Sequence, residues 1–152
     1  MSTVHEKYHT AIETSLSTKK TKIENIDKYI DLYIIDLKTM IKSDYSQLLG
    51  GSLDIFLENI HTLQNLGRAK DTIFRIPFVK GITDKRENID SINNLILSYC
   101  PKEIQVFLIH NLAKSKYQLL NKEMVNPDNS SKEDMIGFIN KINHKNITPL
   151  HL

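Results

Sequence analysis

The chain has 152 residues, of which 40% are hydrophobic and 25% are charged, a composition typical of one globular domain with a buried core. The formal net charge of +2 is spread over mixed lysines and acids, which excludes the clustered basic stripe of a nucleic-acid-binding protein. No apolar run approaches the ~20 residues of a membrane helix, and no hydrophobic signal region begins the chain. Cys100 is the only cysteine, so no internal disulfide forms, and we expect a cytoplasmic protein without membrane contact.

The first third of the chain alternates strand and helix patterns. Residues 10–14 are expected to form a short strand. Thr21 and Glu24 then have the spacing of a capping box and predict the start of an amphipathic helix. Residues 32–37 form a nearly continuous apolar run, which is typical of a parallel strand covered on both faces.

The same alternation continues through the middle of the chain. Ser52 is predicted to begin a helix that ends at Gly67. A third strand is expected at residues 72–79, and Asp84 and Glu87 repeat the capping-box spacing before the next helix.

A fourth strand is expected at residues 104–109, and a loop at 126–130 precedes a last helix with Met135 and Phe138 on one face. The tail at 146–152 is a candidate edge strand. Strands that alternate with helices predict βαβ units, a parallel sheet and an α/β fold. This pattern fits an arc of a barrel as well as an open sheet. We expect four parallel strands in sequential order, with helices on the outer face.

Polar side chains follow each predicted strand, at the edge where parallel α/β folds bind ligands. Together they supply two carboxylates, two cations, a hydroxyl and an imidazole, a set suited to a zwitterionic amino acid joined to a ribose. A structural ion-pair network, in which Arg75 pairs with Glu13 or Asp36, explains the charges equally well. The residues are Glu13, Thr14, Asp36, Lys38, Arg75 and His110.

A series of short motifs at these positions resembles the pyruvate formate-lyase activating enzymes and their relatives, from about His9 to Lys122. Each motif is short, and the resemblance lies in their common order and separations. The motifs are Glu13-Thr14-Ser15, Asp36-Leu37-Lys38, Arg75-Ile76-Pro77, Gly81-x-x-Asp84-x-x-Glu87-Asn88, Leu108-Ile109-His110 and the segment Asn111 to Tyr117.

The resemblance implies a partial (β/α) barrel that binds S-adenosylmethionine (SAM) and a [4Fe–4S] cluster and generates a glycyl radical on a partner such as pyruvate formate-lyase. Glu13 then meets the methionyl ammonium, with Thr14 beside it, and Asp36 and Lys38 contact the amino-acid end of SAM. Arg75 and Pro77 line the adenosine side, and His110 approaches the ribose.

The sequence departs from the family pattern at three places. Leu16 stands where a glycine is common, and Lys80 stands where a proline usually precedes Gly81. The family's C-x3-C-x2-C cluster loop and its Gly-Gly-Glu motif belong before the first strand and are not in this sequence. Because Cys100 alone cannot hold a cluster, we expect no catalytic or metal-binding residues in this chain and weak or lost SAM affinity.

Two functions therefore remain in view. In the first, residues 1–122 are the carboxyl-terminal part of a glycyl-radical-enzyme activating enzyme, inactive by itself, with residues 123–152 packed on the same domain. In the second, the chain is a non-catalytic α/β module, a split or degenerate relative that serves partner binding. In either case the first strand is expected to leave an exposed edge that favours a homo-oligomer.

A competing motif lies at the amino terminus. His5, Glu6 and His9 match the H-E-x-x-H pattern of zinc proteases, which requires both histidines on one face of a long helix. Residues 10–12 turn at once toward a strand, so we do not expect a zinc site.

Overall fold

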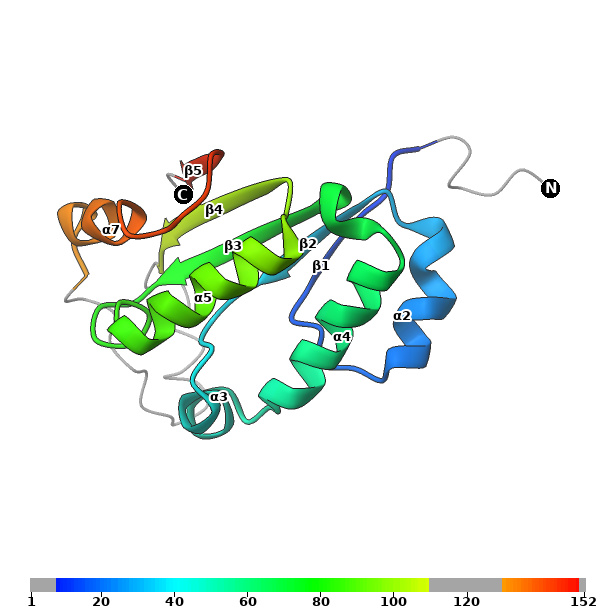
Figure 1. Ribbon diagram of the computed structural model, residues 1–152, viewed down its shortest axis with the longest axis horizontal. Coiled ribbons are helices and arrows are strands. Elements are labelled where there is room, and N and C mark those ends of the chain that lie inside the picture. Colours follow the sequence, from blue (N-terminus) through cyan, green and yellow to red (C-terminus); the bar gives the residue numbers. More distant parts are fainter. Residues whose placement is uncertain (1–7, 110–129, 151–152) are drawn as a thin grey trace, which may run out of the picture.

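The computed structural model describes residues 8–109 and 130–150, which form a five-stranded sheet in the order β1-β2-β3-β4-β5 (Figure 1). All four neighbouring pairs are parallel. The predicted parallel arc of four strands in sequential order is therefore confirmed, and the tail adds a fifth. The strands are β1 (Ala11–Thr14), β2 (Leu32–Asp36), β3 (Thr72–Phe78), β4 (Glu103–Leu108) and β5 (Ile147–Leu150).

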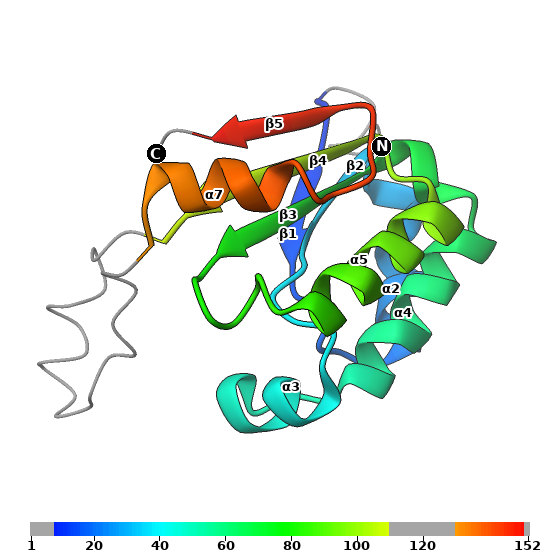
Figure 2. The same cartoon turned by 60° about the vertical axis from the view of Figure 1, so that its left-hand side comes forward.

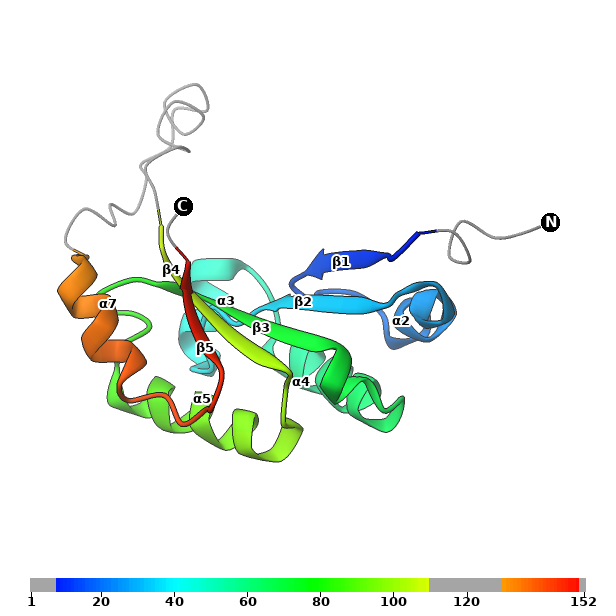
Figure 3. The same cartoon turned by 90° about the horizontal axis from the view of Figure 1, so that it is seen from above.

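Helices cover one face of this sheet, and the opposite face carries no helix in the described part of the chain (Figure 3). The short helix α3 lies beyond the end of β2 (Figure 2). The helices are α2 (Lys20–Ile26), α3 (Lys42–Leu49), α4 (Leu53–Asn65), α5 (Arg86–Tyr99) and α7 (Lys132–Ile139), with 3-10 turns η1 (Asp27–Tyr29) and η2 (Arg68–Asp71). The α/β class and the partial-barrel arrangement follow from this layering.

The strands place alternate side chains in the core under the helices. Ile35 on β2, Phe74 and Ile76 on β3, and Val106 on β4 are all fully buried. The rings of Phe78 on β3 and Phe138 on α7 lie 5.4 Å apart, so α7 packs on the same face. The remaining strand residues point to the open face, where charged and apolar side chains mix.

Two of the predicted helix boundaries are confirmed. Ser52 caps α4, its hydroxyl accepting a hydrogen bond from the Ile55 N–H at 3.4 Å. Gly67 follows the helix with φ +77°, a conformation that favours glycine. The helix thus begins and ends where its cap residues predict.

The two predicted capping boxes at Thr21 and Asp84 are wrong. α2 begins at Lys20, so Thr21 lies inside its first turn. The Asp84 carboxylate instead accepts a hydrogen bond from the Gly81 N–H at 2.6 Å and closes the loop before α5. α3 was not predicted, because Tyr45 is its only buried residue and no apolar periodicity marks it.

None of the described helices is long and apolar enough to cross a membrane.

Candidate functional site

Three charged side chains meet on the open face of the sheet. Asp36 on β2 is the register partner of Arg75 on β3, and the Arg75 Nε donates a hydrogen bond to Asp36 Oδ1 at 3.1 Å. The Arg75 Nη2 donates to Glu13 Oε1 on β1. One guanidinium therefore links the carboxylates of two other strands, and we call Glu13, Asp36 and Arg75 the charged triad.

The charged triad is partly shielded from solvent. The side chains of Arg75 and Asp36 are 20% and 19% exposed, whereas Glu13 is 53% exposed. The guanidinium carbon of Arg75 lies 5.4 Å from the centre of the Phe107 ring on β4, close enough for a cation–π contact. Burial lowers the pKa of Arg75, but hydrogen bonds and charge from Glu13 and Asp36 outweigh it, so the pKa is raised and the cation is fixed.

The other predicted ligands are placed differently. Lys38 is half-buried in the loop after β2 and forms no ion pair or hydrogen bond with the part of the chain that the structure describes. Pro77 is buried two residues after Arg75, and thus on the same face, with Phe107 as its register partner. His110, and the motif that follows it, lie outside the described residues.

Thr14 does not join the charged triad. It alternates with Glu13 along β1 and is the register partner of Ile35, a core residue on the helix-covered face. Its hydroxyl accepts a hydrogen bond from the Leu16 N–H at 3.0 Å. Thr14 therefore shapes the turn after β1 rather than the open face.

Two buried asparagines support the loops around the charged triad, and sequence reasoning missed their role. Asn59 on α4 donates to the carbonyl oxygens of Leu16 and Thr18, each at 2.8 Å. Asn88 on α5 is fully buried and contacts the loop after β2. The available signal was a polar residue on the apolar face of a predicted helix, next to Ile60 and Ile89 respectively.

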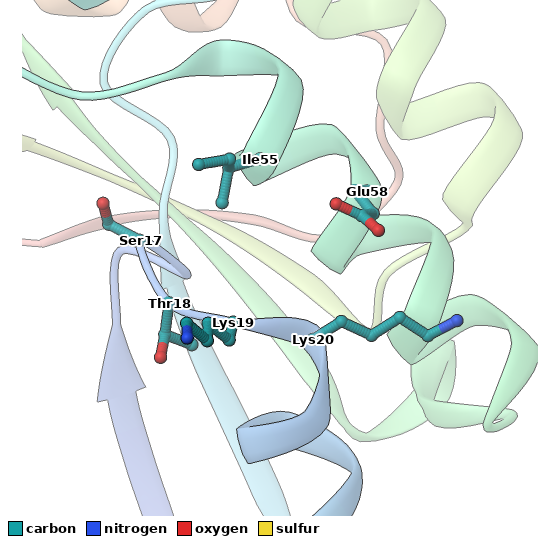
Figure 4. A pocket seen from close by; sticks show the side chains of 6 residues that line it. All are labelled: Ser17, Thr18, Lys19, Lys20, Ile55 and Glu58. Atoms are coloured by element: carbon teal, nitrogen blue, oxygen red, sulfur yellow. The ribbon is translucent and has the colours of Figure 1, made fainter.

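A hollow of about 450 Å³ lies elsewhere, between the loop after β1 and α4 (Figure 4). None of the predicted SAM ligands lines it, and its two lysines and one glutamate are exposed or partly exposed. It belongs to the helix layer and not to the charged face. Its lining residues are Ser17, Thr18, Lys19, Lys20, Ile55 and Glu58.

Among the described residues, no three His, Cys, Asp or Glu side chains gather closely enough to hold a metal ion. Cys100 is exposed and follows α5 just before β4 begins. It therefore lies at the edge of the sheet where the strands begin, away from their carboxyl ends. Residues 5–7 of the H-E-x-x-H match lie outside the described residues.

The fold and the open charged face define the class of protein as a partial (β/α) barrel. The same fold occurs in a domain of the pyruvate-formate lyase-activating enzyme from Bacteroides vulgatus ATCC 8482, with a TM-score of 0.73, 18% identity, and coverage of 96% of this chain and 83% of that one. No protein-family profile matches the chain.

Curated relatives give the family. The chain is 36% identical over 121 residues to the 4-hydroxyphenylacetate decarboxylase activating enzyme of Clostridioides difficile (strain CD196), covering 76% of this chain and 36% of the relative. The trans-4-hydroxy-L-proline dehydratase activating enzyme of Clostridioides difficile is 30% identical, over 76% of this chain and 38% of that protein. The pyruvate formate-lyase 2-activating enzyme of Escherichia coli (strain K12) is 29% identical, over 74% and 38%.

The chain belongs to the family of glycyl-radical-enzyme activating enzymes, as the sequence motifs predicted. It spans little more than a third of the length of these curated relatives.

Proposed function

We propose that this chain is the carboxyl-terminal part of a glycyl-radical-enzyme activating enzyme and supplies one wall of its SAM site. The observation that carries the proposal is the charged triad, which lies on the open sheet face at positions that match the family motifs. Residues 1–122 then form the barrel segment, and residues 123–152 complete the same domain. We place the protein in the cytoplasm.

The amino-acid end of SAM carries one ammonium and one carboxylate, and the open face offers matching charges. The carboxylates of Glu13 and Asp36 retain free lone pairs beside those used by Arg75, because each carboxylate has about four acceptor sites. Lys38 has no partner in the described part of the chain and is the cation proposed to meet the SAM carboxylate. Pro77 supplies an apolar wall, and His110 is proposed to approach the ribose.

The [4Fe–4S] cluster does not fit the residues of this sequence. A cluster of this type needs several cysteine thiolates, and Cys100 is alone and at the amino edge of the sheet. Reductive cleavage of SAM is proposed for the complete enzyme and not for this chain by itself.

The proposed partner is a glycyl-radical enzyme. Relatives are named for decarboxylases, a dehydratase and pyruvate formate-lyase, so the substrate of this protein belongs to the same broad class. If the open face binds no ligand, the second function applies, in which the chain is a non-catalytic module that serves partner binding.

The test is a titration of the isotope-labelled chain with SAM, in which NMR chemical shifts of the backbone amides report binding. Two contacts made by the rest of the enzyme, at ~1.5–3 kcal/mol each, are absent, so affinity should be about two to four orders of magnitude weaker than in the complete enzyme. We expect millimolar binding, with shifts at Glu13, Asp36 and Arg75.

Two variants sharpen this test. Lys38→Ala should abolish the shifts, whereas Lys42→Ala, which removes an equal charge from an exposed ion pair with Asp54, should leave them unchanged. No shift up to the solubility limit of SAM, or shifts confined to other surfaces, contradicts the proposed site. Formation of 5′-deoxyadenosine by this chain with a reductant contradicts the assignment of cleavage to the complete enzyme.

A further inference from the structure

A single buried amide joins two loops at the carboxyl ends of the strands. Asn88 lies in the first turn of α5 and has no exposed surface. Its Oδ1 accepts hydrogen bonds from the Met40 N–H at 2.6 Å and from the Thr39 hydroxyl at 3.5 Å. Its Nδ2 donates to the Thr83 carbonyl at 2.9 Å. The side chain thus ties the loop after β2 to the loop after β3.

The loop after β2 carries Lys38 and is held on both sides of it. The Leu37 N–H donates to the Arg75 carbonyl on β3 at 2.8 Å. Two residues after Lys38, the Met40 N–H is held by Asn88. The backbone of Lys38 is therefore fixed between the charged triad and α5, while its ammonium has no partner in the described structure.

The loop after β3 is itself held by internal hydrogen bonds, so it anchors the Asn88 hydrogen bonds to Met40 and Thr83, which we call the clamp. The Thr83 hydroxyl accepts from the Val79 N–H at 2.8 Å and is paired with the Val79 carbonyl at 3.0 Å. The Gly81 N–H is held by Asp84. Since Thr83 is also buried, Asn88 connects the Lys38 loop to a segment with its own internal hydrogen bonds.

We propose that Asn88 is a positioning residue that fixes the loop bearing Lys38 and thereby sets the affinity of the open face for the carboxylate of its ligand. The part of this inference that concerns ligand affinity rests on the proposed function. The part that concerns the position of the loop rests on the hydrogen bonds alone. Asn88 acts through Lys38 and does not touch the ligand. Without the amide, the partly buried Met40 N–H and the buried Thr83 carbonyl lose their partners, and the loop gains backbone freedom.

The experiment measures amide hydrogen exchange at Met40 in three variants of the full chain and, in a separate binding arm, SAM-induced shifts. Asn88→Ala removes both arms of the clamp, and Met40 should exchange about tenfold faster or more. Asn88→Asp keeps an oxygen for the Met40 N–H but loses the donor to Thr83. It should preserve protection at Met40 and loosen only residues 79–84.

Asn93→Ala is the matched control. Asn93 lies on the same helix and makes two hydrogen bonds, to the Lys141 carbonyl and from the Asn143 N–H, both 2.9 Å. Its loss should lower the global stability without changing local exchange at Met40. A general loss of stability would instead speed exchange at Met40 in both alanine variants.

The binding arm uses Lys38→Ala as the reference. Asn88→Ala should weaken the SAM-induced shifts without abolishing them, whereas Lys38→Ala should abolish them, because Asn88 acts through the position of Lys38. Unchanged exchange at Met40 in Asn88→Ala overturns the inference whether or not SAM binds. A loosened loop with unchanged SAM shifts overturns the link to affinity. Absence of shifts in the unmodified chain counts against the proposed function, and Met40 exchange then decides the clamp alone.

Discussion

Leu16 meets two opposing demands in the turn after β1. Its φ of +53° lies in the left-handed region that favours glycine, yet its side chain is only 1% exposed and belongs to the core. The turn is held in this conformation by Thr14 from one side and by Asn59 from the other. The departure from the glycine common in the family therefore adds a core side chain at the cost of backbone strain.

We predict that Leu16→Gly lowers the free energy of unfolding and that Leu16→Ala lowers it further. Removing a buried leucine side chain costs about 2–5 kcal/mol, whereas relief of the left-handed conformation returns about 1–2 kcal/mol, and only in the glycine variant. Urea unfolding of the three proteins measures the order. A glycine variant as stable as the parent would show that strain outweighs packing.

The charged triad could be predicted from the sequence because parallel strands bring their carboxyl ends to one edge. Arg75 pairs with both Glu13 and Asp36, which is the structural ion-pair network considered from the sequence. The same charged side chains remain the ones proposed to contact the ligand. Thr14 lies on the opposite face of the sheet from Glu13, because neighbouring strand residues point to opposite faces. Asn59 and Asn88 were missed as supports because each pairs with a backbone group far away in the sequence, Leu16 for Asn59 and Met40 for Asn88, which no local pattern marks.

At the scale of elements, α7 is attached to the loop after β3 through Lys80. The Lys80 N–H donates to the Ser130 hydroxyl at 3.0 Å, a bond that the proline usual in the family has no N–H to make. The Lys80 ammonium contacts both carboxylate oxygens of Asp134, at 2.9 and 3.0 Å. Asp134 also completes a capping box with Ser131, so one carboxylate caps α7 and docks it.

This arrangement predicts an acid-sensitive attachment of α7. The hydrogen bond from Lys80, followed by those from Ser131, lowers the pKa of Asp134. A lowered pKa in the folded state means that the contribution to stability is complete above the usual aspartate pKa of about 3.9 and is lost as the pH falls through the lower folded value. Unfolding measured over this acid range should show the loss.

Asp134→Asn should reduce this part of the acid dependence, because the amide cannot titrate. Asp90→Asn is the control, since Asp90 is exposed and its Oδ2 lies 3.7 Å from the Nε of Arg86, both within α5. An identical acid dependence in the parent and in Asp134→Asn would contradict the role assigned to this carboxylate.

Element boundaries show where the sequence patterns were sufficient. α4 has a strong apolar face and a serine cap, and both of its ends were predicted correctly. α3 has little apolar surface to bury and left no periodic signal. The capping-box spacing at Asp84 was real, but the carboxylate is used by the Gly81 N–H, a competition that spacing alone does not reveal.

At the scale of the whole molecule, the described residues form an open sheet with two edges. In the described structure, β1 pairs only with β2, and β5 pairs only with β4. β1 has just four residues, and Ala11 and Glu13 on it are exposed. Unpaired strand edges present free N–H and C=O groups to other chains.

We predict a concentration-dependent dimer or aggregate formed through the β1 edge, measured by static light scattering. Ala11→Lys should shift the equilibrium toward monomer, because a charge on an edge strand opposes pairing. Thr148→Lys places the same charge on exposed β5 and should have little effect. A monodisperse monomer at high concentration would contradict the prediction, and a stronger effect of Thr148→Lys would move the interface to β5.

The sequential strand order also has a consequence for synthesis on the ribosome. Each strand pairs with the strand made immediately before it, so each new strand meets a template that has already emerged, and chains are built at about 5–20 residues per second. β3 is covered by β4 after about thirty residues, but β4 waits until residues 147–150 have been made. Among the strand edges that a later strand covers, the outer edge of β4 therefore waits through the longest intervening stretch of chain, and a chaperone that recognises unpaired strands should bind there.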